Sequence, residues 1–292
     1  MKKSLIALAL VGAFSAPSFA QTAAAPAAEA APASPHTLTG NLGIFSSYRF
    51  RGIDQTYGQP ALQGGIDYSH SSGLYVGNWN SNVSSGAGFA EGNLEMDFYG
   101  GYKLGLGDLT LDFGGIYYYY PGSSGRPLSG SNAKNLGQTV GTSAVDNGEI
   151  YFGASWKFLT MKYSYAVTDY FSLPDSKGTS YLDLGGNFDL GDGWGINGHV
   201  GQLFPKSYKY NTAGSQSIGY TDWKLGVTKD IGGWVLGATY VGTNAKGSCA
   251  SGAAEFYCFA NSITDTTPTA TFGTKTKDAG RDILVLSVSK TF

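Results

Sequence analysis

From residue 38 onward the chain is a succession of segments of about ten residues in which apolar and polar side chains alternate. Such alternation predicts β-strands with one apolar and one polar face. The connections alternate too: odd-numbered gaps are long, whereas even-numbered gaps have a few residues each. We therefore expect an antiparallel sheet with long loops at one end and tight turns at the other. About twelve strands are expected, at residues 38–51, 59–70, 73–83, 93–104, 108–120, 148–158, 160–171, 179–190, 194–204, 219–229, 233–243 and 281–292.

This asymmetry of connections favours an outer-membrane barrel over a soluble sandwich. Bacterial outer-membrane barrels have short periplasmic turns and longer extracellular loops. A tilted transmembrane strand needs about 9–11 residues, which matches the segments. Lipid cannot satisfy the free edge of a sheet, so the last strand must pair with the first. We predict an all-β fold, a closed antiparallel transmembrane β-barrel over residues 38–292.

The two faces of each expected strand differ clearly. In residues 93–104, Leu94, Met96 and Phe98 share one face, and Glu95 and Asp97 share the other. In a transmembrane barrel the apolar face contacts lipid and the polar face lines the lumen. Lipid-facing aromatic side chains at strand ends predict two interfacial girdles. The periplasmic girdle would hold Tyr68, Phe158, Trp194, Trp234 and Phe292, and the extracellular girdle Phe50, Tyr119, Phe171 and Phe204.

The N-terminal segment predicts export to the bacterial outer membrane. Residues 1–20, "MKKSLIALALVGAFSAPSFA", have the basic start, the apolar run and the small residues of a secretory signal peptide. Residues 21–37 are rich in Ala and Pro and predict an extended periplasmic tether. Charged residues make up only 14% of the chain, and the net charge is -2, so nucleic acid is not an expected partner.

The C-terminal stretch "ILVLSVSKTF" places Leu284, Leu286, Val288 and Phe292 at alternate positions. It resembles the last strand of bacterial outer-membrane proteins, which implies recognition by the barrel-assembly machinery. Lys290 departs from that pattern, although a lysine near the membrane interface can extend its ammonium group to water. The other expected partners are outer-membrane lipids and lipopolysaccharide; the oligomeric state is not predicted.

The stretch "YRFRGIDQTYGQPALQGGIDYSHSSGLYVGNWNSNV", residues 48–83, resembles the opening of the TorF family of porin-like proteins. The shared parts are a strand ending in "RGI", a Gln-Thr turn, "PALQGGIDYSH", and a Gly-aromatic strand ending in Trp and "SN". Residues 93–103, "NLEMDFYGGYK", continue the likeness more weakly. The resemblance implies a small outer-membrane barrel with pore activity.

The lumen-facing charges are close to balance, so net lumen charge predicts no strong ion selectivity. Arg49 and Arg51 are expected on the first strand near the extracellular mouth. They would either set a transverse field across a constriction or join internal ion pairs that fill a narrow lumen. The pore-lining candidates are Arg49, Arg51, Asp67, Glu95, Asp97, Lys103, Asp112, Glu149, Lys157, Lys162, Asp183, Asp189, Asp222 and Lys224.

The cysteines and histidines give little support to a cofactor or an enzyme. Cys249 and Cys258 are the only cysteines, and in an exported chain they predict one disulfide. His36 falls in the tether and His70 at a periplasmic turn, while His199 faces the lumen and can approach Asp222 or Lys224. No serine is expected beside His199, and hydrolysis needs a nucleophile, a base and an orienting group together. We predict no cofactor, no metal and no enzymatic activity.

About twelve strands give a bore between that of a filled eight-stranded barrel and that of an aqueous porin. The predicted function is passive diffusion of ions or small hydrophilic solutes. Two alternatives remain: a plugged barrel that presents its loops to partners, and an outer-membrane hydrolase. Residues 121–147 would be the displayed Gly/Ser/Asn-rich loop, and loop 244–280 is expected to cover the mouth or to fold inward.

Overall fold

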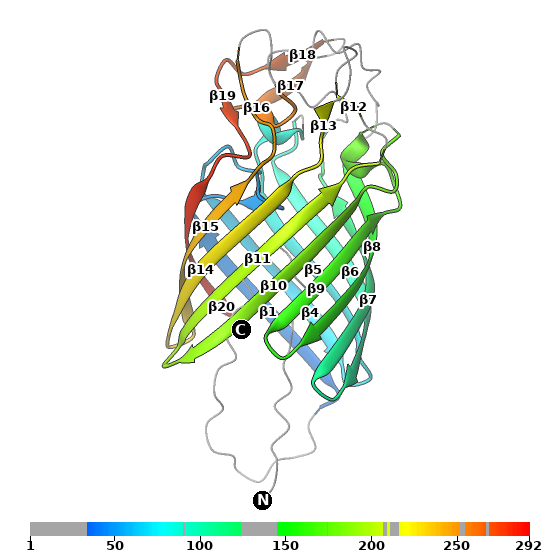
Figure 1. The fold of residues 1–292 in the computed structure, drawn as a ribbon, viewed down its shortest axis with the longest axis vertical. Helices are drawn as coiled ribbons and strands as arrows, with labels where there is room; N and C mark the ends of the chain where they lie inside the picture. Colours follow the sequence, from blue (N-terminus) through cyan, green and yellow to red (C-terminus); the bar gives the residue numbers. More distant parts are fainter. Residues whose placement is uncertain are drawn as a thin grey trace, which may run out of the picture.

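The strands close into one antiparallel barrel, as predicted (Figure 1). The computed structural model describes residues 34–89, 91–123, 145–173, 175–206, 209–210, 216–250, 255–266 and 269–292. The expected signal peptide, most of the tether and most of loop 121–147 lie outside them. The barrel strands, in chain order, are β1 (His36–Phe45), β4 (Ala61–His70), β5 (Leu74–Asn82), β6 (Leu94–Leu106), β7 (Leu109–Tyr119), β8 (Asp146–Trp156), β9 (Leu159–Ala166), β10 (Ser180–Gly191), β11 (Trp194–Phe204), β14 (Thr221–Ile231), β15 (Trp234–Thr243) and β20 (Ile283–Thr291).

Closure is made by β1, which pairs with β4 on one side and with β20 on the other. The register with β20 runs from Asn41 opposite Thr291 to Phe45 opposite Ser287. Tight connections at 71–73, 107–108, 157–158, 192–193 and 232–233 lie at what we call the turn end. The longer connections lie at the opposite, loop end, so the predicted asymmetry of connections is confirmed. The described residues contain no helix long and apolar enough to cross a bilayer.

The outer surface of the barrel is apolar. Leu225 is 64% exposed and Ile66 58% exposed, whereas their neighbours Lys224 and Asp67 point inward and are more buried. This reverses the pattern of a soluble barrel and is the surface that a lipid bilayer requires. Inward-pointing tyrosine side chains have room because glycines lie beside them on neighbouring strands. A Cβ on Gly201 of β11 would lie 1.8 Å from the hydroxyl oxygen of Tyr181 on β10.

Seven of the nine expected girdle aromatics lie on the barrel exterior, but two do not. Phe50 and Phe171 instead pack against Tyr118 inside the loop end, with ring centroids 5.5 and 5.4 Å from it. Their assignment to the extracellular girdle was wrong because neither lies on a barrel strand. The residues on the exterior are Tyr68, Tyr119, Phe158, Trp194, Phe204, Trp234 and Phe292.

Lysines stack on tryptophans at the turn end. Lys229 lies 5.0 Å from the ring of Trp194, and Lys290 lies 5.0 Å from the ring of Trp234. The exposed Lys157 makes the same contact with its neighbour Trp156, at 4.7 Å. Lys157 adopts a positive φ of 54° in the turn between β8 and β9, so it does not line the lumen. That prediction was wrong because the wall strand ends one residue earlier.

The first strand is shorter than expected, and this difference fills the loop end of the lumen. β1 ends at Phe45 instead of continuing to residue 51. The chain then forms a small hairpin, β2 (Arg49–Phe50) with β3 (Ile53–Asp54). At its tip Gly52 has φ of 79°, and a Cβ there would lie 2.7 Å from Asp222 Cβ on β14. The segment 46–56, which we call the inner hairpin, therefore reaches across to the barrel wall.

Loop 244–280 covers the loop end. Its described residues form β16 (Cys258–Ala260) paired with β19 (Thr276–Asp278), and β17 (Ile263–Thr266) paired with β18 (Thr269–Phe272). We call residues 244–282 the cap; it lies above the barrel in Figure 1. Beside it lie the short helices η1 (Ser85–Ala87) and η3 (Tyr170–Ser172) and the strand pair β12 (Lys209–Tyr210) and β13 (Gln216–Ser217). The sequence predicts that this loop either covers the mouth or folds inward, and its described residues cover the mouth.

Candidate functional site

Arg51 fixes the inner hairpin inside the barrel. Its two guanidinium NH groups donate to the two carboxylate oxygens of Glu149 on β8, at 3.0 and 2.7 Å. One of them also donates to the Tyr170 hydroxyl at 3.1 Å. The guanidinium carbon lies 4.4 Å from the ring centroid of Tyr181. Arg51 and Glu149 are both buried, and a two-point contact of this kind is among the strongest charge-assisted pairs in proteins.

Arg49 ties the inner hairpin to the cap. Its NH1 group donates to the backbone carbonyls of Ala279 and Arg281, at 2.9 and 3.1 Å. Asp54 lies 3.6 Å from Arg49 and 2.8 Å from Arg281. Burial lowers the pKa of the Arg49 guanidinium to about 10, against the opposing effect of Asp54, so the group stays protonated at neutral pH. Arg49 therefore acts in the hairpin–cap contact rather than on the pore wall.

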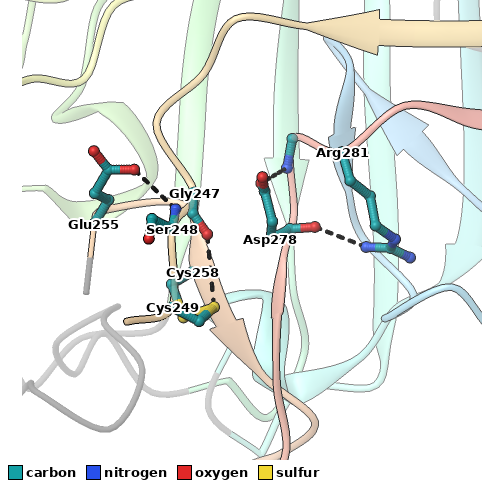
Figure 2. Close-up of a disulfide and its surroundings, with 8 residues drawn as sticks. Gly247, Ser248, Cys249, Glu255, Cys258, Asp278 and Arg281 are labelled. Atoms are coloured by element: carbon teal, nitrogen blue, oxygen red, sulfur yellow. Dashed lines mark hydrogen bonds between the residues drawn. A yellow bond between two sulfur atoms is a disulfide. The ribbon is translucent and has the colours of Figure 1, made fainter. Parts of the chain in front are cut away.

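The disulfide lies in the same part of the cap. Cys249 and Cys258 are joined, with Cα atoms 5.2 Å apart, and Cys258 pairs with Asp278 across the β16–β19 ladder. Figure 2 shows the bridge in the same region as Asp278, the last residue of β19, whose carbonyl accepts from Arg281 at 2.8 Å. The disulfide therefore stabilises the β16–β19 pair. The chain that follows β19 carries the Ala279 and Arg281 carbonyls, which accept from Arg49.

Glu95 and Asp97 lie deep in the loop half of the lumen. Tyr48 of the inner hairpin donates to Glu95 at 3.1 Å. Asp97 is 1% exposed, and neither of its carboxylate oxygens has a hydrogen-bond partner in the described part of the chain. Tyr120 stacks on Phe89 above this region, with ring centroids 4.0 Å apart. Side chains therefore fill the loop half of the barrel interior.

A cavity of about 130 Å³ lies next to the inner hairpin, on the side of β9, β10, β11 and β14. His199 on β11 contacts two carboxylates there: its Nδ1 lies 2.9 Å from Asp183 and its Nε2 lies 2.7 Å from Asp222. Tyr181 donates to the other oxygen of Asp222 at 2.9 Å. Because Tyr181 also stacks on Arg51, the His199 cluster and the inner hairpin form one connected network.

A second polar cluster lies on the opposite strands, in the turn half of the lumen. Tyr99 donates to Asp67 at 2.5 Å, and Tyr75 donates to Asp112 at 2.7 Å. Lys103 lies over the ring of Tyr75, 4.8 Å from its centroid. These contacts tie the wall side chains to one another, so this part of the lumen carries charge in a fixed arrangement.

A family model described as "bacterial protein of unknown function (Gcw_chp)" matches residues 29–272. The match covers most of the barrel as well as the segment before it.

The chain belongs to the Gcw_chp family.

Several solved structures of outer-membrane channels resemble this Gcw_chp chain. The NanC porin matches with 10% identity and a TM-score of 0.44, over 88% of this chain and 99% of NanC. The toluene transporter TodX of P. putida matches with 11% identity and a TM-score of 0.41, over 90% of this chain and 91% of TodX. An anion-selective porin from Comamonas acidovorans matches with 12% identity and a TM-score of 0.37, over 88% of this chain and 99% of the porin. Sequence identities and TM-scores this low do not identify a solute for this chain. No curated protein matches the sequence.

The predicted lumen residues of the Gcw_chp chain separate into distinct groups. Arg51 meets Glu149, and Asp183 meets Asp222 through His199, whereas Arg49 belongs to the hairpin–cap contact. Lys162 lies 3.8 Å from the ring centroid of Tyr151. Asp189 is exposed at the turn end and accepts from the Gly191 amide. The expectation that Arg49 and Arg51 lie on the first barrel strand was wrong, because the chain leaves the wall after Phe45.

Sequence reasoning missed the tyrosines and loop residues that hold these charges. Tyr170 and Tyr181 contact Arg51, and Arg281 contacts Asp54, from distant parts of the chain. The available sequence signal was the string "RGID". Its glycine, Gly52, readily adopts the positive φ that a tight turn needs and so indicates that the strand ends there. His36, expected in the tether, belongs to β1 and hydrogen-bonds with Tyr68 at 2.8 Å.

Proposed function

We propose that this Gcw_chp protein is a narrow channel of the bacterial outer membrane for ions or small hydrophilic solutes. The observation that carries the proposal is the interior of the barrel: a closed transmembrane wall encloses ionised side chains and a polar cavity. A wall that only anchored loops in a membrane would be stable with an apolar filling. Export by a signal peptide at residues 1–20, the periplasmic tether and membership of the TorF porin-like family form part of this proposal.

The inner hairpin is the constriction of the proposed channel. It occupies the loop half of the lumen and is held by Arg51 on Glu149 and by Arg49 on cap carbonyls. The loop end would face the cell exterior, in keeping with short periplasmic turns in such barrels. A solute that enters from that side must pass the cap and then the hairpin. Movement of the hairpin away from Glu149 would widen the path into the cavity.

A second candidate function is that of a closed barrel that displays its cap to a partner. The filling of the loop half by buried ion pairs and aromatic side chains favours this alternative. The two functions differ in one measurable property. A channel conducts when the inner hairpin is released, whereas a display scaffold stays closed.

Planar-bilayer recording tests the channel proposal. We expect small conductance for the wild type and at least a several-fold larger conductance for Arg51→Ala, because that substitution removes the contact with Glu149. Swelling of liposomes in a small sugar should follow the same order. Absence of conductance in both proteins, with both inserted and folded, would support the display function instead.

We also propose that the protein is not an enzyme. Both ring nitrogens of His199 contact carboxylates, and the hydroxyl group that binds Asp222 is that of Tyr181. Among the described residues, therefore, no serine or cysteine is hydrogen-bonded to His199 as a nucleophile would be. Purified protein should hydrolyse neither phospholipid nor peptide. Hydrolysis that disappears in His199→Ala would contradict this.

A further inference from the structure

One strand interrupts the apolar outer surface of the barrel. Trp79 and Ser81 of β5 are buried inside, so the residues that alternate with them point to the lipid side. Those residues are Asn78, Asn80 and Asn82, which we call the asparagine stripe. On the other barrel strands the middle of the outer face carries aliphatic, aromatic or glycine residues. A row of amide groups on this face therefore needs a physical reason.

Two members of the asparagine stripe serve the local structure of the wall. Asn82 accepts from the Leu62 amide at 2.7 Å and donates to the carbonyl of the residue before β4 at 3.2 Å. Asn78 donates to a backbone carbonyl of β6 at 3.0 Å and accepts from Asn80 at 2.6 Å. The oxygen atoms of both side chains therefore have donors within the chain.

Asn80 differs from its two neighbours in the stripe. Its Nδ2 donates to Asn78 at 2.6 Å and makes a longer contact, 3.4 Å, with the Gly64 carbonyl. Among the residues that the structure describes, none donates to its Oδ1. Asn78 is the central residue of β5 and Asn80 lies two positions nearer the loop end, at a depth where lipid supplies no water to an amide. Asn80 therefore keeps one free acceptor and one weakly engaged donor.

The neighbours of Asn80 leave its amide accessible from the lipid side. Gly64, directly opposite on β4, has no side chain to cover it. Met96, directly opposite on β6, is unbranched, and such a side chain adapts readily to a partner surface. Small residues at a contact let the backbones of associating membrane segments approach closely. A second protein surface can therefore reach this amide.

The chemistry of the Asn80 amide fits a second copy of this chain. The hydrocarbon chains of lipid offer no hydrogen-bond donor, whereas a second copy offers the same amide. A two-fold axis beside Asn80 lets each Nδ2 donate to the Oδ1 of the other copy, which is the self-complementarity that a symmetric dimer requires. Barrel strands tilt by about 35–45°, so two facing β5 strands cross at about 70–90°. Only a short part of each strand then lies at the axis, and one amide decides the contact.

We propose that β5 is a dimerisation surface, on which a second copy of this chain is held by reciprocal hydrogen bonds between the two Asn80 amides. The dimer does not depend on the proposed channel function, because the contact lies on the outer wall and each barrel keeps its own lumen. Trp79, the neighbour of Asn80, faces inward and packs against Tyr48 of the inner hairpin, with ring centroids 5.5 Å apart. The dimer contact therefore lies directly behind the inner hairpin.

Sedimentation equilibrium of the full chain in density-matched detergent measures this association. We expect a monomer–dimer equilibrium for the wild type. Asn80→Leu should weaken dimerisation at least about tenfold, because both reciprocal hydrogen bonds are lost. Asn80→Gln keeps an amide and should retain the dimer. Leucine is at home on a lipid-facing position, and heat-modifiable electrophoretic mobility verifies that each variant is folded.

A matched control lies on β11, which is diametrically opposite β5 in the closed strand order. Gln202 is also a lipid-facing amide, but its Oε1 already accepts from the Thr221 hydroxyl and its Nε2 donates to the Leu203 carbonyl. Gln202→Leu removes an amide of the same chemistry from the other side of the barrel. We expect this variant to dimerise like the wild type.

Cross-linking locates the contact. The two cysteines of the chain form the disulfide, so a single introduced cysteine reports on its own surroundings. A short bismaleimide should join two copies of Met96→Cys, which lies beside Asn80, but not two copies of Val200→Cys on β11.

A wild type that stays monomeric, or a folded Asn80→Leu that associates like the wild type, would overturn the proposal. Lipid that copurifies with a monomeric wild type and is lost in Asn80→Leu would also overturn it, and would identify lipid as the occupant of the asparagine stripe. Cross-linking of Val200→Cys in place of Met96→Cys would move the interface to the opposite wall and exclude β5. None of these outcomes changes the conductance expected of a single barrel.

Discussion

Arg51, at the tip of the inner hairpin, donates to both carboxylate oxygens of Glu149, a residue 98 positions later on the barrel wall. Both side chains are almost fully buried. Removal of one partner would leave the other charge without compensation in the barrel interior. This pair therefore holds the hairpin in place and also makes the hairpin sensitive to a single substitution.

We predict that Arg51→Gln and Glu149→Gln will each destabilise the protein by about 3–5 kcal/mol, the usual cost of breaking a buried ion pair. The double variant should lose less than the sum of the two, because no isolated charge remains. Denaturant midpoints for the barrel refolded in lipid vesicles measure this. Additive losses would show that the two side chains do not depend on each other.

The hairpin–cap contact should be weaker than the Arg51–Glu149 contact. Asp54 is 2% exposed, forms an ion pair with Arg281 and accepts hydrogen bonds from the Thr56 and Gly58 amides, whereas the Arg281 side chain is 28% exposed. We expect Asp54→Ala to increase hydrogen exchange of the amides in 46–56 strongly and Arg281→Ala to increase it only modestly. Lys246→Ala, a cap substitution outside this contact, serves as the control. The reverse order would mean that Asp54 is not the centre of the contact.

Loss of the disulfide should loosen the cap and leave the barrel folded. Cys249 and Cys258 are nine positions apart, and a loop of that size gains about 2–3 kcal/mol from closure in the chain-entropy model. We expect Cys249→Ser/Cys258→Ser to be cut faster by protease within 244–282 while strand content by circular dichroism is unchanged. Addition of reductant should reproduce this in the wild type and have no effect on the double variant.

Leu225 and Lys224 are neighbours on β14 and face opposite sides of the wall. We predict that Leu225→Arg will cost about 2–4 kcal/mol in a bilayer, because it places a charge in lipid near the middle of the strand. Lys224→Arg, one residue away, should be tolerated because its side chain lies in the lumen. Urea unfolding in vesicles compares the two. Equal costs would contradict the assignment of faces.

Much of the barrel followed from local patterns. Alternation placed Leu94, Phe98 and Leu225 on the outside and Glu95, Asp97 and Lys224 on the inside, because side chains of a strand point to opposite faces in turn. The contrast between short and long connections predicted the two ends. The requirement that lipid leaves no free strand edge predicted the pairing of the last strand with the first. Each of these inferences needs only neighbours in the chain or the properties of the membrane.

The sequence by itself determined the wall: its strands, its faces and its closure. Only the tertiary structure decided what lies inside. Alternation continues through Tyr48 and Arg51 as if the strand went on, yet the chain turns inward after Phe45 because Glu149 and the cap carbonyls offer the arginines partners. Those partners are separated from the hairpin by about a hundred residues and by more than two hundred. A buried charge adopts the conformation in which it is paired, and pairing at such separations is set by closure of the barrel rather than by local sequence.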